Sequence, residues 1–148
     1  SDLAELLRLS DHAPADLTAG NNSARDVLML AARVLDARLA TLMKKPNALA
    51  LWADATARAD KLSYSEPDDW FYPVRHFEGA ALLGAGKAAA AEAVYREDLR
   101  RHPHNGWALF GLWNALALQK KNAEASSVRA EWATAWQRAD FRLTTTAF

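Results

Sequence analysis

The chain has no cysteine, no excess charge of either sign and no long apolar run. The absence of cysteine excludes disulfide bridges, thiolate metal sites and cysteine nucleophiles, and it suits the cytoplasm and the periplasm alike. Eighteen Lys and Arg residues balance eighteen Asp and Glu residues. We therefore expect no nucleic-acid partner, because such partners are usually bound by a basic patch.

The apolar runs fall well short of the ~20 residues that span a bilayer, and the N-terminus lacks the layout of a signal peptide. We therefore expect no membrane partner. Of the two compartments we favour the cytoplasm, with the periplasm as the alternative.

What the sequence does contain is helical periodicity over most of its 148 residues, a length that fits one domain. Ser23 and Asp26 resemble a helix-capping arrangement. The apolar residues that follow at intervals of three and four are Leu28, Ala32, Leu35, Leu39 and Leu42. No segment before the last eight residues alternates like a strand, so the predicted fold class is all-α.

Four breaks, "KKPN", "SYSEPDD", "GAGK" and "LQKKN", divide the helical pattern. The predicted elements are a short helix over 1–10, helical hairpins over 23–62, 68–102 and 105–139, and an extended tail over 140–148.

A repeat relates the hairpins. The middle hairpin has the spacing G-x2-L, then A-x3-Y, then a proline eight residues later, in Gly79, Leu82, Ala91, Tyr95 and Pro103. A shift of 34 residues places Leu82 on Leu116 and Ala91 on Ala125. Gly79 and Ala91 are predicted to be the small residues that let two helices cross closely, while Tyr95 supplies the bulk that enters the space.

This layout resembles the tetratricopeptide-repeat family. The stretch "EPDDWFYPVRHFEGAALLGAGKAAAAEAVYREDLRRHPHNGWALFGLWNAL" and the close "AWQRADFRLTTTAF" resemble, more narrowly, the C-terminal segment of larger bacterial repeat proteins. The resemblance implies a right-handed superhelical stack of about three hairpins preceded by a half-repeat helix. The chain departs from the family pattern at Trp113, which takes the small position matching Gly79, and this predicts a splayed last hairpin.

The resemblance also implies a non-catalytic protein or peptide interaction module that binds on the concave face of the stack. The family's groove-lining positions fall on Arg33, Ala37, His76, Ala80, Trp107, Phe110 and Asn114. Trp107 and Phe110 would anchor apolar groups, and the polar members would pair with a peptide backbone or a carboxylate. The alternative for the two aromatic residues is that they pack against the neighbouring hairpin.

A second interpretation of the function is structural. In it the chain is the C-terminal end of a longer solenoid whose binding face or catalytic partner domain lies upstream. Leu3, Leu6 and Leu7 form an apolar stripe on the first helix, which either packs on such a missing part or pairs in a homodimer.

Reactive groups are not gathered in any recognisable motif. His102 and His104 lie in a turn at a helix end without an evident third ligand, and Ser126 and Ser127 lie inside a helix and not in the glycine-framed turn of a nucleophilic serine. The sequence therefore predicts no enzyme, no cofactor and no metal site.

The tail "FRLTTTAF" alternates at Phe141, Leu143 and Thr145, which suits an extended segment. We expect it to fold back over the end of the stack as a cap, because terminal repeats need one. The alternative is that it occupies the groove and masks it.

Overall fold

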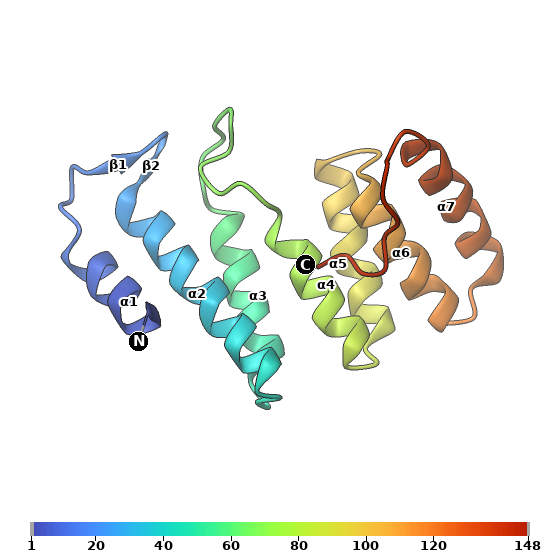
Figure 1. Ribbon diagram of the computed structural model, residues 1–148, viewed down its shortest axis with the longest axis horizontal. Helices are drawn as coiled ribbons and strands as arrows, with labels where there is room; N and C mark the ends of the chain where they lie inside the picture. The colour runs from blue at the N-terminus through green and yellow to red at the C-terminus, as the bar shows by residue number, and fades with distance from the viewer. Residues whose placement is uncertain (1, 148) are drawn as a thin grey trace. The chain divides into compact units, whose positions relative to one another are not determined.

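The computed structural model describes residues 2–147 and is all-helical apart from one short pair of strands (Figure 1). Residues 1 and 148 lie outside the described part, so the predicted helix over 1–10 and the tail over 140–148 are compared without them. The chain divides into two compact units, residues 1–74 and 75–148, and each is described by itself. Within residues 2–147 no helix combines the length and the apolar character that a membrane crossing requires.

The first unit is built around one long helix. Its elements are α1 (Asp2–His12), β1 (Thr18–Ala19), β2 (Asn22–Ser23), α2 (Ala24–Leu42) and α3 (Ala48–Ala59). Helix α2 contacts both α1 and α3. The buried Ser10 hydroxyl of α1 donates to the Arg25 carbonyl of α2 at 3.1 Å, so the first helix has a packing partner within this unit.

The strand pair was not predicted. Thr18 pairs with Ser23 and Ala19 with Asn22, which is too short for an alternating pattern to be visible in the sequence. The Asn22 side chain connects this turn to the segment that follows α3. It donates to the Ser63 carbonyl at 3.0 Å and accepts from the Ser63 N–H at 2.7 Å.

Helix α2 confirms the predicted cap and corrects the predicted stripe. The Ser23 hydroxyl accepts from the Asp26 N–H at 3.1 Å. However, Leu39 and Leu42 are 39% and 73% exposed. The buried residues of the helix are Ala24, Leu30, Ala32, Val34, Ala37 and Ala40. A single stripe was the wrong pattern, because α2 packs against helices on two sides and buries residues on both.

The second unit contains two helical hairpins. Its helices are α4 (Val74–Gly84), α5 (Ala88–Arg101), α6 (Gly106–Leu118) and α7 (Asn122–Ala135). The four residues related by the 34-residue shift, Leu82, Leu116, Ala91 and Ala125, are all buried.

Helix α4 begins later than the predicted start of its hairpin at residue 68. Tyr72 precedes Pro73, and a residue before proline disfavours the helical conformation. The aromatic side chains of this stretch pack on one another instead, with ring centroids 5.3 Å apart for Trp70 and Tyr72 and 4.4 Å apart for Phe71 and Tyr72.

The first helices of the three hairpins, α2, α4 and α6, end in the same way. In each a backbone N–H bonds to the carbonyl five residues earlier, at 2.8, 2.8 and 3.0 Å, from Lys45, Lys87 and Lys121 respectively. The residue before each has a positive φ, of 53° at Lys44, 72° at Gly86 and 60° at Lys120. This is the Schellman closure of a helix end, and it recurs 34 residues apart at Gly86 and Lys120.

Candidate functional site

Tyr95 of α5 passes between two helices of the second unit. Its side chain is fully buried. A Cβ atom built on Gly79 of α4 or on Gly111 of α6 would overlap the phenol ring. These two glycines therefore open the passage that the ring occupies, and the hydroxyl reaches the C-terminal tail on the far side.

The tail is held by that hydroxyl. The Thr146 Oγ1 atom lies 2.6 Å from the Tyr95 hydroxyl oxygen and donates to the His76 carbonyl of α4 at 3.1 Å. A threonine hydroxyl has one hydrogen, so Tyr95 must be the donor in the first bond. Burial raises the pKa of Tyr95 well above its ordinary value, which keeps that proton in place. Thr146 is 2% exposed and Leu143 is 7% exposed.

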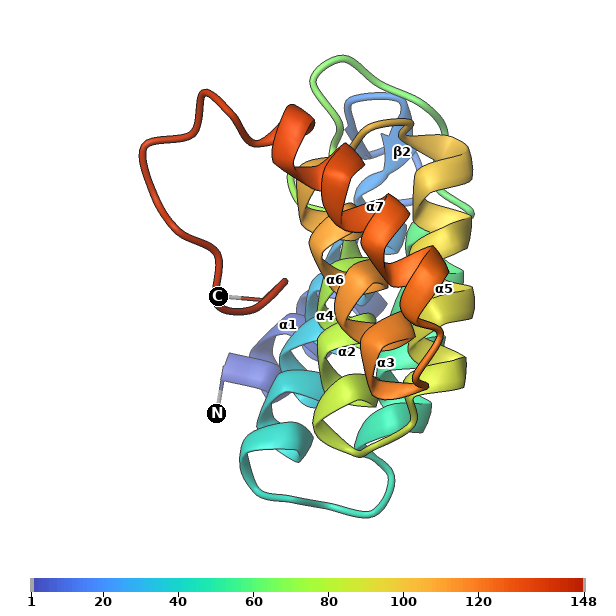
Figure 2. The ribbon, with the colours of Figure 1, turned by 90° about the vertical axis from the view of Figure 1, so that its right-hand side faces the viewer.

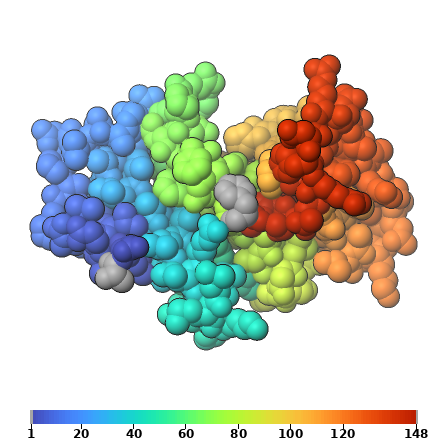
Figure 3. Space-filling model, in the orientation of Figure 1, coloured from blue at the N-terminus to red at the C-terminus, as the bar shows by residue number. Residues whose placement is uncertain are grey.

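The tail therefore lies across α4 and α6, on the side of these helices away from α5 (Figure 2). Its atoms cover part of this face in the space-filling view (Figure 3). We expected the tail to fold back over the end of the stack; the structure instead places its three threonines against α4 and α6. Phe141 packs on the two tryptophans at the end of the last hairpin, with its ring centroid 5.9 Å from Trp107 and 5.3 Å from Trp136.

The tail leaves a hollow of about 310 Å³ beside it. We call this hollow the groove; its lining residues are Ala80, Leu83 and Gly84 of α4, Phe110, Gly111, Asn114 and Leu118 of α6, and Thr144, Thr145 and Thr146 of the tail. Three of the predicted binding residues, Ala80, Phe110 and Asn114, thus meet in one place. The Asn114 amide nitrogen donates to the Phe110 carbonyl at 2.7 Å, and its oxygen is an acceptor suited to a backbone N–H.

His76 contributes its backbone and not its ring. The ring is buried, with Nε2 lying 3.2 Å from Asp98 Oδ2. The Asn105 amide donates to the same carboxylate oxygen at 3.1 Å, and the Asn105 side-chain oxygen accepts from the Trp107 N–H at 3.0 Å at the start of α6. This network joins α4, α5 and α6 and so fixes the position of the carbonyl that holds Thr146.

The two aromatic residues predicted as anchors both pack on α7 or the segment that follows it. Trp107 is half-buried, with its ring 5.7 Å from Trp136. Phe110 lies 5.6 Å from Trp132, and Trp113 lies at the same distance from Trp132. These ring contacts lie within the 105–139 hairpin itself, whereas the packing alternative named the neighbouring hairpin. Phe110 also lines the groove.

The remaining two predicted residues belong to the first unit and do not line the groove. Ala37 is fully buried, and Arg33 pairs with Asp54 at 3.4 Å. Both therefore have packing or pairing roles within α2 and α3.

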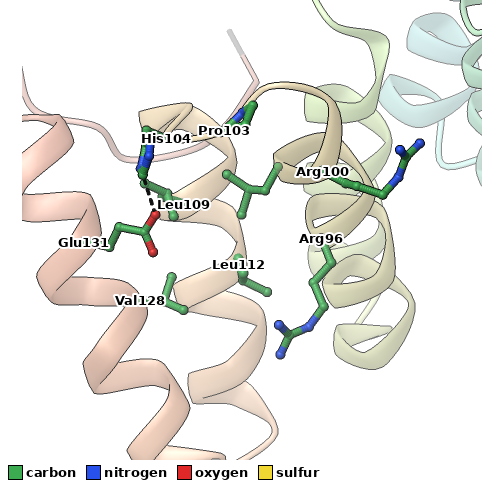
Figure 4. Close-up of a pocket in the computed structure, with 9 residues that line it drawn as sticks. Arg96, Arg100, Pro103, His104, Leu109, Leu112, Val128 and Glu131 are labelled. Carbon is green, nitrogen blue, oxygen red and sulfur yellow. Dashed lines mark hydrogen bonds and ion pairs between the residues drawn. The ribbon is translucent and has the colours of Figure 1, made fainter.

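A second pocket, of about 370 Å³, lies between α5, α6 and α7 (Figure 4). Its apolar wall includes Leu109, Leu112 and Val128. The charged groups around it are paired within the protein: Arg96 with Glu92 and Glu124, Arg100 with Glu97, and His104 with Glu131. This pocket thus presents little charge that could select a ligand.

Sequence reasoning missed the features that hold the tail. It treated Tyr95 as bulk and overlooked its hydroxyl, and it aligned Trp113 with Gly79 where the structure places Gly111 against the same ring as Gly79. Two signals pointed to these features, namely a glycine inside each of two expected helices and a run of three threonines in the tail.

The polar groups that reach this face of α4 and α6 are the His76 carbonyl, the Asn114 amide and the threonine hydroxyls of the tail. Among residues 2–147 no group of three or more acidic, histidine or cysteine side chains could hold a metal ion. No family model matches the chain, and no curated protein or solved structure matches it either.

Proposed function

We propose that the chain is a non-catalytic interaction module that binds a non-helical peptide segment of another protein in the groove of the second unit. In this proposal the hairpins α2–α3, α4–α5 and α6–α7 are tetratricopeptide-like repeats of a right-handed superhelical stack, and α1 is a half-repeat. The Schellman closure shared by the three first helices supports a repeat, because unrelated hairpins need not end alike.

One observation carries the functional proposal: a non-helical segment of the chain already lies across α4 and α6 with its Thr146 side chain 2% exposed. A surface that buries one such segment has the shape and the hydrogen-bonding groups to bind another. The hollow beside the tail adds room lined by half-buried apolar residues and by Asn114.

The test is a selection of short random peptides on the immobilised full chain, followed by affinity measurement in solution by fluorescence anisotropy. The blocked variant is Ala80→Arg, which places a long charged side chain in the groove. The matched control is Ala89→Arg, which adds the same group at an exposed position of α5. Circular dichroism checks that both variants keep their helicity.

We expect peptides that bind the wild type and the Ala89→Arg control equally and the Ala80→Arg variant at least about tenfold more weakly, a difference of about 1.4 kcal/mol. If no peptide is selected, or if both variants bind as the wild type does, the groove is not a peptide site and the proposal is wrong.

A further inference from the structure

We propose that the C-terminal tail is an internal ligand of the face of α4 and α6 that adjoins the groove, and that the partner segment carries the same two anchors: a large aliphatic residue followed three positions later by threonine or serine. The tail and the partner then compete for one site, and the free protein is in its self-occupied state. This inference rests on the proposed function and specifies its ligand.

The threonine anchor is selective because its hydroxyl takes part in two hydrogen bonds, as the donor in one and the acceptor in the other. It donates to the His76 carbonyl and accepts from Tyr95. Serine can make both bonds, whereas valine, which has nearly the same shape, leaves the buried Tyr95 hydroxyl without its acceptor. The site therefore distinguishes a hydroxyl from a methyl group.

The aliphatic anchor is Leu143, three residues earlier. Leu143 and Thr146 are buried, while Thr144 and Thr145 between them are exposed. The Thr145 hydroxyl accepts from the Ala147 N–H at 3.2 Å, a local bond within the tail. The two buried side chains thus define the recognised pattern as Leu-x-x-Thr.

The tail can leave without unfolding a helix. Helix α7 ends at Ala135, and residues 137–142, which connect it to Leu143, are all exposed. The tail also leaves the 310 Å³ hollow beside it open. A partner that makes the same two anchor contacts and fills this hollow as well gains contacts that the tail lacks, and it can displace the tail although the tail is tethered.

The experiment uses the full chain with the tail anchors weakened, Leu143→Ala together with Thr146→Val. The probe is a fluorescent synthetic peptide with the sequence of residues 140–148, DFRLTTTAF. We expect the probe to bind the weakened chain at least about tenfold more tightly than the wild type, in which the tethered tail competes at high effective concentration. Anisotropy titration measures both affinities.

Probe variants test the pattern itself. In the probe, Thr146→Val is expected to weaken binding about tenfold or more and Thr146→Ser by a few-fold at most. Thr144→Val, at an exposed position, is the matched control and should change little. Equal binding of the probe to the wild-type and weakened chains, no binding to either, or equal binding of the valine and serine probes at residue 146 would overturn the inference.

A second measurement covers the case in which the weakened chain does not fold. A specific protease site is placed at residues 137–140 of the otherwise wild-type chain, which is then cut after folding. If the cut chain exchanges its tail for the labelled probe, the tail is a ligand; if the tail stays bound indefinitely or the cut chain unfolds, it is a structural part and the inference is wrong. Should selected peptides bind the groove while the probe fails, the inference falls and the proposed function stands.

Discussion

At the scale of single residues, the second unit depends on two glycines that face one ring. Tyr95 is fully buried, and a Cβ atom at Gly79 or Gly111 would overlap its ring. In an exposed helix an alanine would be about 1 kcal/mol more favourable than glycine. At Gly79 and Gly111 alanine is instead less favourable than glycine, because α4 or α6 must move away from α5 to make room for the methyl group.

We therefore expect Gly79→Ala and Gly111→Ala each to lower the free energy of unfolding by about 1–3 kcal/mol, as overpacking in a close-packed core does. The matched control is Gly84→Ala, at the end of α4, where a Cβ meets nothing within 4 Å; it should be neutral or slightly stabilising. Urea unfolding followed by circular dichroism measures all three variants. A stabilised Gly111→Ala protein would contradict the ring contact described above.

At the scale of elements, two helices end at a lysine whose backbone has the left-handed conformation that favours glycine. Lys44 and Lys120 adopt positive φ in positions where the equivalent residue of the middle hairpin is Gly86. A residue with a side chain costs about 1–2 kcal/mol in this conformation, whereas glycine adopts it readily.

Replacing Lys44 with Gly is accordingly expected to raise the free energy of unfolding by about 0.5–1 kcal/mol. Lys45→Gly is the control, since Lys45 is the neighbouring exposed residue and is not among the positive-φ positions; it should be neutral or destabilising. Melting temperatures compare the two variants, and a more stable Lys45→Gly than Lys44→Gly would count against the Schellman closure.

A second element-level feature is the carboxylate that ties α5 to the turn between α6 and α7. Glu92 accepts from Lys121 Nζ at 2.8 Å, from the Gln119 amide at 2.7 Å and from Arg96 Nε at 2.9 Å. The bond from Lys121 is the largest cause that lowers the pKa of Glu92, which together with the other two brings it to about 2.

Because the folded pKa lies below the ordinary value of 4.5, the stabilisation is present above pH 4.5 and is lost as the pH falls towards 2. Glu92→Gln is expected to cost on the order of 1–2 kcal/mol at pH 7, since Lys121 and Arg96 are partly exposed and solvent screens them. The difference from wild type should shrink between pH 4.5 and pH 2.5 in urea titrations. A difference that stays constant over this range would show that the carboxylate charge is not responsible. Asp140→Asn, which changes an exposed carboxylate far along the chain from this network, is the control.

At the scale of the whole molecule, the tail makes a hydrogen bond that spans almost the full length of the second unit. Thr146 bonds to the backbone of His76, seventy residues earlier. The bond connects the end of the chain to the first helix of the unit, and both partners of the hydroxyl are buried.

Thr146→Val in the full chain is expected to lower the stability of this unit by about 1–3 kcal/mol, the cost of leaving the buried Tyr95 hydroxyl unpaired. Hydrogen exchange of the backbone amides of α4, α6 and the tail reports the change directly. Thr144→Val, which changes an exposed neighbouring residue, is the control and should leave the hydrogen exchange of these amides unchanged. If the two variants behave alike, the buried hydroxyl does not hold the tail.

The sequence by itself determined that the chain is all-helical. Periodicity, proline, and the small residues Gly79 and Ala91 are local signals, and the helix conformation depends on residues three and four apart that the sequence displays directly. The spacing of 34 residues between Leu82 and Leu116, and between Ala91 and Ala125, was also visible in the sequence, and all four residues are buried.

The tertiary structure decided which faces are buried and where the tail lies. Leu39 and Leu42 belong to an apolar stripe yet are exposed, because the helices that cover α2 lie on other faces. Likewise the destination of Thr146 depends on a hydroxyl from α5 that emerges between two glycines on two other helices. No local pattern encodes that meeting, since it arises only when three helices distant in the sequence have packed together.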